Sequence, residues 1–304
     1  MLNAEDQRQR RPVTGLPFVR SWFARYWLAV WFGIIFAMRA GAIIPGGDGW
    51  DARIYIEASR VWLAGGNPWG FLIDGNGYAA PPLSLIPVMP LTLLPPQIAP
   101  HVMVAGAAVS AVLTIRRLCL PWWWLLFPPL LDAVWNGTLD AYLVLLIVSG
   151  NGWLAAIAKI YAALPLVLLG RWRQIAILAV AVAVTAPVLP WAAFLEAIPV
   201  IAERFATQTR GGMSAVAIPG LIPVAAVSLV LLGRRAAWLA VPAIWPSTQW
   251  YYSVIALPAL AASPLVAAAI AIPIPGLVVA GMAGQVVWEC IGRRDTATRD
   301  TPTA

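Results

Sequence analysis

The sequence predicts an all-α protein, a polytopic bundle of transmembrane helices. Hydrophobic residues make up 61% of the 304-residue chain and charged residues only 11%, whereas a soluble domain carries about 25% charged residues. Apolar runs recur along nearly the whole chain, and several approach the ~20 residues that cross a bilayer as a helix. Most of the surface must therefore face lipid, and no polar stretch is long enough for a large soluble domain.

The basic residues predict the orientation of the chain. All but one of the 20 are arginines, and such clusters mark the cytoplasmic loops of membrane proteins, so they do not indicate a nucleic-acid partner. We expect a multi-pass protein of the cell membrane, with a cytoplasmic basic tail at 1–26, a single membrane domain at 27–290 and a polar tail at 291–304. The clusters are Arg8, Arg10, Arg11, Arg20 and Arg25, then Arg116–Arg117, Arg171 and Arg173, Arg234–Arg235, and Arg293–Arg294.

About nine or ten crossings are expected from the apolar segments. The first, 27–44, leads into an acidic first extracytoplasmic loop at 45–81, and a second polar stretch occupies 191–213. Non-helical backbone at membrane depth is tolerated only where protein or a cavity covers it, so the 27 prolines predict an inner cavity. The other segments are 81–95 (short and broken by prolines), 102–115, 122–134, 139–149, 152–170, 175–188, 215–232, 236–245, 252–262 and 264–289, which 273–276 can split.

The first extracytoplasmic loop contains the clearest amphipathic pattern. Residues 51–64 predict a helix with Asp51 and Trp62 on one face, and the sequence Gly-Gly-Asn-Pro at 65–68 ends it. We expect this helix to lie along the outer interface, with Trp62 and Trp69 at the depth of the lipid headgroups.

Two aspartates of this loop are candidate catalytic bases. Asp51 is on the apolar side of its helix, where partial loss of water raises its proton affinity toward the working range of a general base. Asp48 is a second candidate. The alternative for both is helix capping, since aspartate favours N-terminal turns.

The lone lysine predicts an anion site. Lys159 stands in an apolar segment, where an ammonium group is costly and usually has a functional partner. It could bind a phosphate, together with Tyr161, or it could be a structural lysine whose head group reaches water. Asp132, Asn136 and Asp140 surround a predicted helix break, and they either pair with a cation or line a polar cavity.

A late polar break combines hydrogen-bonding side chains with aromatic rings. Gln249, Trp250 and Tyr251 offer the mixture that sugar sites require, because rings cover C–H faces while polar groups orient hydroxyls. The alternative is an interfacial aromatic belt.

Metal and cofactor sites are not expected. Cys119 and Cys290 have no metal-binding spacing, and the lone His101 follows a proline in what we interpret as a surface or turn position.

The order of these motifs resembles a known family. An aspartate and a tyrosine open the loop helix, Asp51-Ala-Arg-Ile-Tyr55, which ends in Asn67-Pro68-Trp69, and Tyr78 precedes Pro81-Pro82-Leu83. Asn136-Gly-Thr-Leu-Asp140, Lys159-Ile-Tyr161 and Trp250-Tyr-Tyr252 follow. The chain is similar over about 48–260 to glycosyltransferase family 87 (DUF2029), a branch of the C-type integral-membrane glycosyltransferases. It departs from the family in the two alanines before Pro81 and in the lost proline after Tyr161.

This resemblance implies a hexosyltransferase, with mannose as the sugar typical of the family. The donor would be a polyprenyl-phosphate sugar, and the acceptor a lipid or glycan at the outer face of the membrane, with inversion at the anomeric carbon. It implies Asp51 as base with Asp48 in reserve, Lys159 and Tyr161 at the donor phosphate, and no metal. Substrate-binding residues would be Tyr55, Asn67, Tyr78, Asn136, Asp140, Gln249, Trp250 and Tyr251.

Two other functions remain open from the residues alone. A lipid-linked-sugar carrier or other transporter would show two related halves with paired broken helices, and none are evident in the sequence. A non-catalytic membrane scaffold of the same fold is the third possibility.

Overall fold

The computed structural model of the chain describes residues 22–43, 48–207, 213–246 and 248–299. These residues are about 75% helical and form no strands, apart from one isolated bridge between Ile73 and Asn76. The all-α prediction is therefore confirmed for the part of the chain that the structure describes.

Many of the helices are short and interrupted. In chain order the α-helices are α2 (Trp22–Ile43), α3 (Trp50–Leu63), α4 (Ala99–Arg117), α5 (Pro128–Asn136), α6 (Asp140–Val148), α7 (Gly152–Ala158), α8 (Ala163–Leu168), α9 (Trp172–Thr185), α10 (Trp191–Thr207), α11 (Ile222–Leu232), α12 (Ala236–Ile244), α13 (Leu257–Leu260), α14 (Pro264–Ile270) and α15 (Leu277–Arg299). The 3-10 helices are η2 (Pro82–Leu85), η3 (Met89–Leu93), η4 (Trp122–Leu126), η5 (Ile160–Ala162), η6 (Ala215–Ala217), η7 (Pro219–Leu221), η8 (Gly233–Arg235) and η9 (Trp250–Ala256).

Among the described residues, two helical stretches are long and apolar enough to cross a membrane. They are Ala99–Arg117 and Pro219–Ile244, and α5 with α6 would make a third crossing if this pair, bent by 114°, is one broken span. Four shorter apolar helices accompany them. A polytopic bundle agrees with these lengths, and the nine or ten crossings stay a prediction.

Most of the predicted breaks are present. The segment 81–95 forms only η2 and η3, and the last apolar segment is split between α14 and α15. The second polar stretch is helical from Trp191 to Thr207, as α10. Helix α15 continues to Arg299, so the predicted tail at 291–304 is helical as far as Arg299.

The expectation of one continuous segment over 152–170 is wrong. Helix α7 ends at Ala158, and Lys159 is extended, with φ −146° and ψ 118°. Pro165 explains part of this break, because a proline ring clashes with the carbonyl four residues earlier, here that of Tyr161. Pro165 itself is tolerated within the first turn of α8, because an N–H at this position would have no partner in the helix.

The amphipathic helix of the first loop is confirmed, as α3. It packs against α4, α5 and the short helices η2 and η3, and its Ile54, Tyr55 and Ile56 are buried. Trp69 is only 4% exposed and donates from Nε1 to the Ala80 carbonyl at 3.2 Å. Trp69 is therefore enclosed by neighbouring rings of the same loop and α10, and its depth in the membrane stays a prediction.

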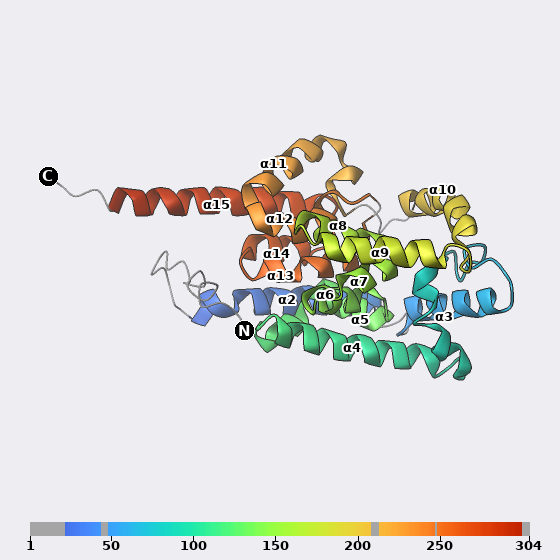
Figure 1. Ribbon diagram of the computed structural model, residues 1–304. Helices are drawn as coiled ribbons and strands as arrows, with labels where there is room; N and C mark the ends of the chain where they lie inside the picture. Colours follow the sequence, from blue (N-terminus) through green and yellow to red (C-terminus); the bar gives the residue numbers. More distant parts are fainter. Residues whose placement is uncertain (1–21, 44–47, 208–212, 247, 300–304) are drawn as a thin grey trace, which may run out of the picture.

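The loop helix and the arginine-rich helix ends lie at opposite ends of the molecule. In Figure 1, α3 and α10 lie at one end of the molecule. The first residues of α2 and the last residues of α4 and α15 lie toward the other end. Arg116 and Arg117 occupy the last turn of α4. This separation is what the positive-inside rule predicts if α3 is on the outer side.

A glycine corner joins α5 to α6 beneath α3. Gly137 has φ +64°, and a Cβ added there would lie 3.0 Å from the Ala52 Cβ and 3.1 Å from Val104 Cγ2. The Gly49 amide also donates to the Trp135 carbonyl at 2.8 Å. The first turn of α3 is therefore held directly against the corner.

We predict that Gly137→Ala destabilises the protein by about 2–4 kcal/mol, combining left-handed backbone strain with overpacking against α3. Gly150→Ala is the matched control, because Gly150 also has positive φ (+88°) but open space around its Cβ position. It should cost only the backbone strain, about 1–2 kcal/mol. Unfolding of both variants in detergent, followed by circular dichroism, measures the difference; equal losses would contradict close packing at the corner.

Candidate functional site

A cavity of about 600 Å³, partly open to the outside, lies where α3, α5, α10 and η9 converge. Polar, charged and aromatic side chains make up most of its wall. The lining residues are Arg39, Trp50, Asp51, Ile54, Tyr55, Asn76, Gly77, Tyr78, Ala79, Asp132, Asn136, Lys159, Ile201, Arg204, Met213, Gln249, Trp250, Tyr251, Tyr252 and Pro273. The inner cavity predicted from the prolines is thus present.

Lys159 reaches the cavity from the break between α7 and η5. Its side chain is nearly buried, and its Nζ lies 3.7 Å from Asp140 Oδ2. The ammonium group is also 5.4 Å from the ring centroid of Tyr55 and 5.3 Å from that of Tyr252, within the range of cation–π attraction. These contacts exclude a lysine that extends to bulk water, and they leave the cation facing the cavity.

Asp140 and Tyr161 stand behind this lysine and do not line the cavity. The Asp140 carboxylate accepts hydrogen bonds from the Tyr161 hydroxyl and, at 2.7 Å, from Thr138 Oγ1. The Tyr161 ring stacks on Tyr252, with centroids 4.4 Å apart. The structure thus does not bring Asp140 and Tyr161 to the cavity wall; Asp140 pairs with Lys159, and Tyr161 bonds to Asp140.

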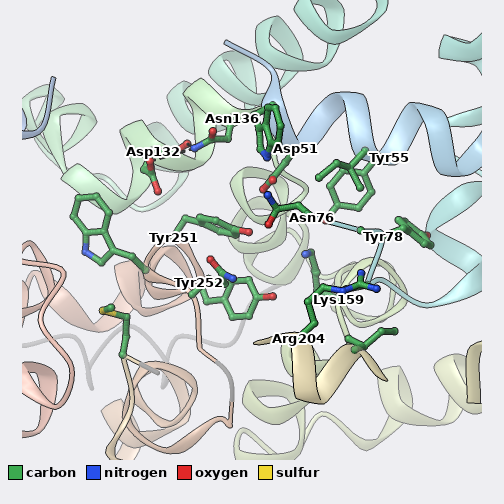
Figure 2. Close-up of a pocket in the computed structure, with 18 of the residues that line it drawn as sticks. Asp51, Tyr55, Asn76, Tyr78, Asp132, Asn136, Lys159, Arg204, Tyr251 and Tyr252 are labelled. Carbon is green, nitrogen blue, oxygen red and sulfur yellow. Dashed lines mark hydrogen bonds between the residues drawn. The ribbon is translucent and has the colours of Figure 1, made fainter. Parts of the chain in front are cut away.

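Asp51 lies in the first turn of α3, with its side chain directed into the cavity (Figure 2). Burial raises the pKa of Asp51 from 3.8 to about 6, although the nearby Lys159 charge and a hydrogen bond with Tyr251 act in the opposite direction. Removal from water therefore outweighs the attraction of the cation. A carboxylate of this kind accepts protons near neutral pH, as a general base must.

Four further polar or charged side chains lie on two sides of Asp51. Figure 2 shows Asp132 and Asn136 on one side, and Lys159 and Arg204 on the other. The Asn136 Nδ2 donates to the carbonyl of Asp132 at 2.8 Å and to its Oδ1 at 3.2 Å. Lys159 and Arg204 thus lie on one side of Asp51, and the amide of Asn136 and the carboxylate of Asp132 lie on the other.

Two tyrosines form the wall next to the cations. Tyr55 and Tyr78 meet edge to face, with ring centroids 5.7 Å apart. The Tyr78 hydroxyl is bonded to Ser84 and donates to the Pro81 carbonyl, and burial raises the pKa of Tyr78 well above its ordinary value. Tyr78 therefore offers a neutral aromatic surface, and its hydroxyl is already engaged.

The late aromatic segment belongs to the cavity and not to an interfacial belt. Gln249, Trp250 and Tyr251 all line the cavity, as predicted, and so does Tyr252. The Trp250 Nε1 donates to the Ile270 carbonyl at 2.8 Å, which holds the indole in the wall.

Two predicted residues lie elsewhere. Asp48 Oδ2 is 2.7 Å from His101 Nδ1 at the surface of α4, and the structure does not bring Asp48 to the cavity. Asn67 is exposed and accepts the Trp69 backbone N–H at 3.0 Å, a local turn bond. Both side chains are engaged by neighbours outside the cavity, so their predicted roles as reserve base and substrate ligand are not supported.

The sequence reasoning missed Arg39 and Asn76. The Arg39 guanidinium lies 4.9 Å from the Trp250 ring centroid, and the signal for it was available, because an arginine inside an apolar segment is costly and usually functional. Asn76 follows a tight turn of the first loop and has no sequence signal that separates it from any turn asparagine.

Among the described residues, no cluster of three or more His, Cys, Asp or Glu side chains could hold a metal ion. Comparison with known proteins found no match: no protein family, no curated protein and no solved structure is detectably similar to this chain.

We predict that Asp51→Asn stabilises the folded protein above pH 6. The folded pKa of Asp51 is raised, so its stabilising effect is fully present below about pH 4 and is lost as the pH rises through about 6. Removing the charge should therefore increase stability by about 1–2 kcal/mol at pH 8 and by little at pH 4. Thermal melting at both pH values checks this, with Asp74→Asn, in an exposed turn, controlling for loss of a carboxylate. A larger gain at pH 4 would contradict the assignment.

Proposed function

We propose that the protein is an integral membrane glycosyltransferase of the family 87 type. It transfers a hexose, mannose being the family's usual sugar, from a polyprenyl-phosphate donor to a lipid or glycan acceptor at the outer face of the membrane. The observation that supports this most is the placement of Asp51 and Lys159, far apart in sequence, in one cavity.

The two charges suit the two ends of such a transfer. Asp51 takes the proton of the acceptor hydroxyl as that oxygen attacks the anomeric carbon from the face opposite the phosphate. The bond from the anomeric carbon to the phosphate oxygen breaks, and the phosphate leaves with the bonding electrons, giving an inverted sugar and a polyprenyl phosphate. Lys159 stabilises the charge that develops on the phosphate, so a cation is needed there more than a general acid.

The other side of the cavity suits the acceptor. The amide of Asn136 and the carboxylate of Asp132 can exchange hydrogen bonds with hydroxyl groups, and Gln249 and Trp250 add a polar tip and a flat ring. A sugar hydroxyl approaching from this side would reach Asp51 opposite the cations.

The proposed orientation places α3 outside and the N-terminus in the cytoplasm, with about nine or ten crossings. The position of α3 opposite the arginine-bearing end of α4 supports it (Figure 1).

Asp51→Asn should lower transfer by about 10²–10⁴-fold, because a general base is lost, while the protein still elutes as a folded species. Asp48→Asn is the matched control and should keep near wild-type transfer, since Asp48 pairs with His101 away from the cavity. The wild-type rate should rise with pH through about 6 as Asp51 loses its proton. Transfer at the wild-type rate by Asp51→Asn would exclude this mechanism.

The assay itself separates the alternatives. Purified protein in vesicles is given a radiolabelled polyprenyl-phosphate sugar with candidate lipid acceptors. Label on an acceptor supports the enzyme, movement of intact donor between leaflets supports a carrier, and neither outcome supports a scaffold.

The orientation is tested with the cysteines of the chain. Cys119 is exposed just beyond the arginine-bearing end of α4, so in a Cys290→Ser background an impermeant maleimide should label it only in inverted vesicles. Leu72→Cys, at an exposed site of the first loop, in a background lacking both native cysteines, should be labelled only in right-side-out cells. The reverse pattern would exclude a base on the outer face.

A further inference from the structure

The cavity contains a second cation whose position depends on a glycine. Arg204 belongs to the last turn of α10, and its side chain lines the cavity near Lys159 (Figure 2). A Cβ added to Gly77 would lie 2.0 Å from Arg204 Nη1 and 2.9 Å from the Phe71 carbonyl oxygen. No side chain fits at Gly77 unless the guanidinium moves.

Glycine at position 77 is not required by the backbone. Gly77 does not have the positive φ that favours glycine, whereas Gly75 in the same loop does (+80°). The absence of a side chain at Gly77 is therefore explained by space, which the guanidinium of Arg204 and the Phe71 carbonyl oxygen occupy.

Helix α10 is anchored so that Arg204 faces the cavity. Phe194, in its first half, packs on Trp69 with ring centroids 5.4 Å apart. Ile201 is 8% exposed and lines the same cavity one turn before Arg204. Contacts from both halves of the helix thus direct its last turn inward.

We propose that Lys159 and Arg204 together form a two-cation site for a lipid phosphate monoester. This rests on the proposed function, in which the donor is a phosphate diester with one negative charge. When the sugar leaves, the phosphate becomes a monoester with a second ionisable oxygen, whose pKa is near 6, so it carries nearly two charges at pH 7.5.

Two cations on one side of the cavity match the charge of this product better than that of the donor. Arginine adds a planar pair of N–H donors, which lysine lacks. The transition state, in which the second charge develops, gains from the same match. A consequence is that the lipid phosphate product binds tightly and inhibits the enzyme.

The test measures binding without any sugar. Farnesyl phosphate and its methyl diester are titrated into detergent-purified protein, and binding is measured by calorimetry. We expect the monoester to bind more tightly than the diester at pH 7.5. Arg204→Gln should weaken monoester binding about 10- to 100-fold, the effect of losing charged hydrogen bonds, and should reduce the difference between the two ligands. Arg204→Lys should fall in between.

Gly77→Ala provides an independent variant that leaves every charge in place. It should weaken monoester binding as Arg204→Gln does, and the double variant should be no worse than either single one. Gly70→Ala is the matched control, because a Cβ there meets Asn67 only at ordinary distances of 3.5 Å or more. Size-exclusion chromatography confirms that each variant is folded.

Several outcomes would overturn the proposal: equal binding of monoester and diester by the wild type, inorganic phosphate binding as tightly as farnesyl phosphate, or wild-type binding by Gly77→Ala. Failure of this proposal can be distinguished from failure of the proposed function. Selective monoester binding without sugar transfer would refute the transferase and keep the lipid phosphate site, whereas transfer without selective binding would do the reverse.

Discussion

The buried ammonium group of Lys159 determines how the cavity is built. A cation that is 8% exposed is stable only with charged or polarisable partners close by. Asp140 provides the countercharge at 3.7 Å, and Tyr55 and Tyr252 present their ring faces. These partners come from α6, α3 and η9, so one cation brings three elements around a common space. A hydrophobic residue at this position would pack at lower cost, and the ion pair is therefore better explained by function than by stability.

The same cation and the surrounding burial act on Asp51 in opposite directions. Lys159 favours the ionised carboxylate, while loss of water favours the protonated form, and burial is the larger effect because the pKa rises to about 6. The balance keeps Asp51 mostly ionised at neutral pH and still able to hold a proton. Without Lys159 the carboxylate would be protonated more of the time, and in full solvent it would be a weaker base. The charge of Lys159 therefore lowers the proton affinity of Asp51, in opposition to the effect of burial.

Composition and helix periodicity were enough to predict the helical class, the loop helix and most of the breaks, because these depend on local sequence. The shared cavity of Asp51 and Lys159 could be expected only from the resemblance, since no local pattern links residues so far apart. The break at Lys159 was missed because the ring of Pro165 disturbs the helix four residues earlier, at the Tyr161 carbonyl, within an otherwise apolar run. Arg39 was overlooked despite its costly position, and the placement of Arg204 beside Gly77 depends on the folded loop and not on a local pattern.

Asp48 and Asp51 show why residue type alone could not select the carboxylate that lines the cavity. Both are aspartates of the same loop, and only one reaches the cavity. Gly49 lies between them in the left-handed region, with φ +70°, immediately before the first residue of α3. A Cβ at Gly49 would meet Pro100 at 2.9 Å, so the turn is pressed against the start of α4, where His101 follows and pairs with Asp48. Past the turn, the helix directs Asp51 to the opposite side. The backbone conformation of one glycine therefore assigns one carboxylate to a surface contact with His101 and the other to the cavity.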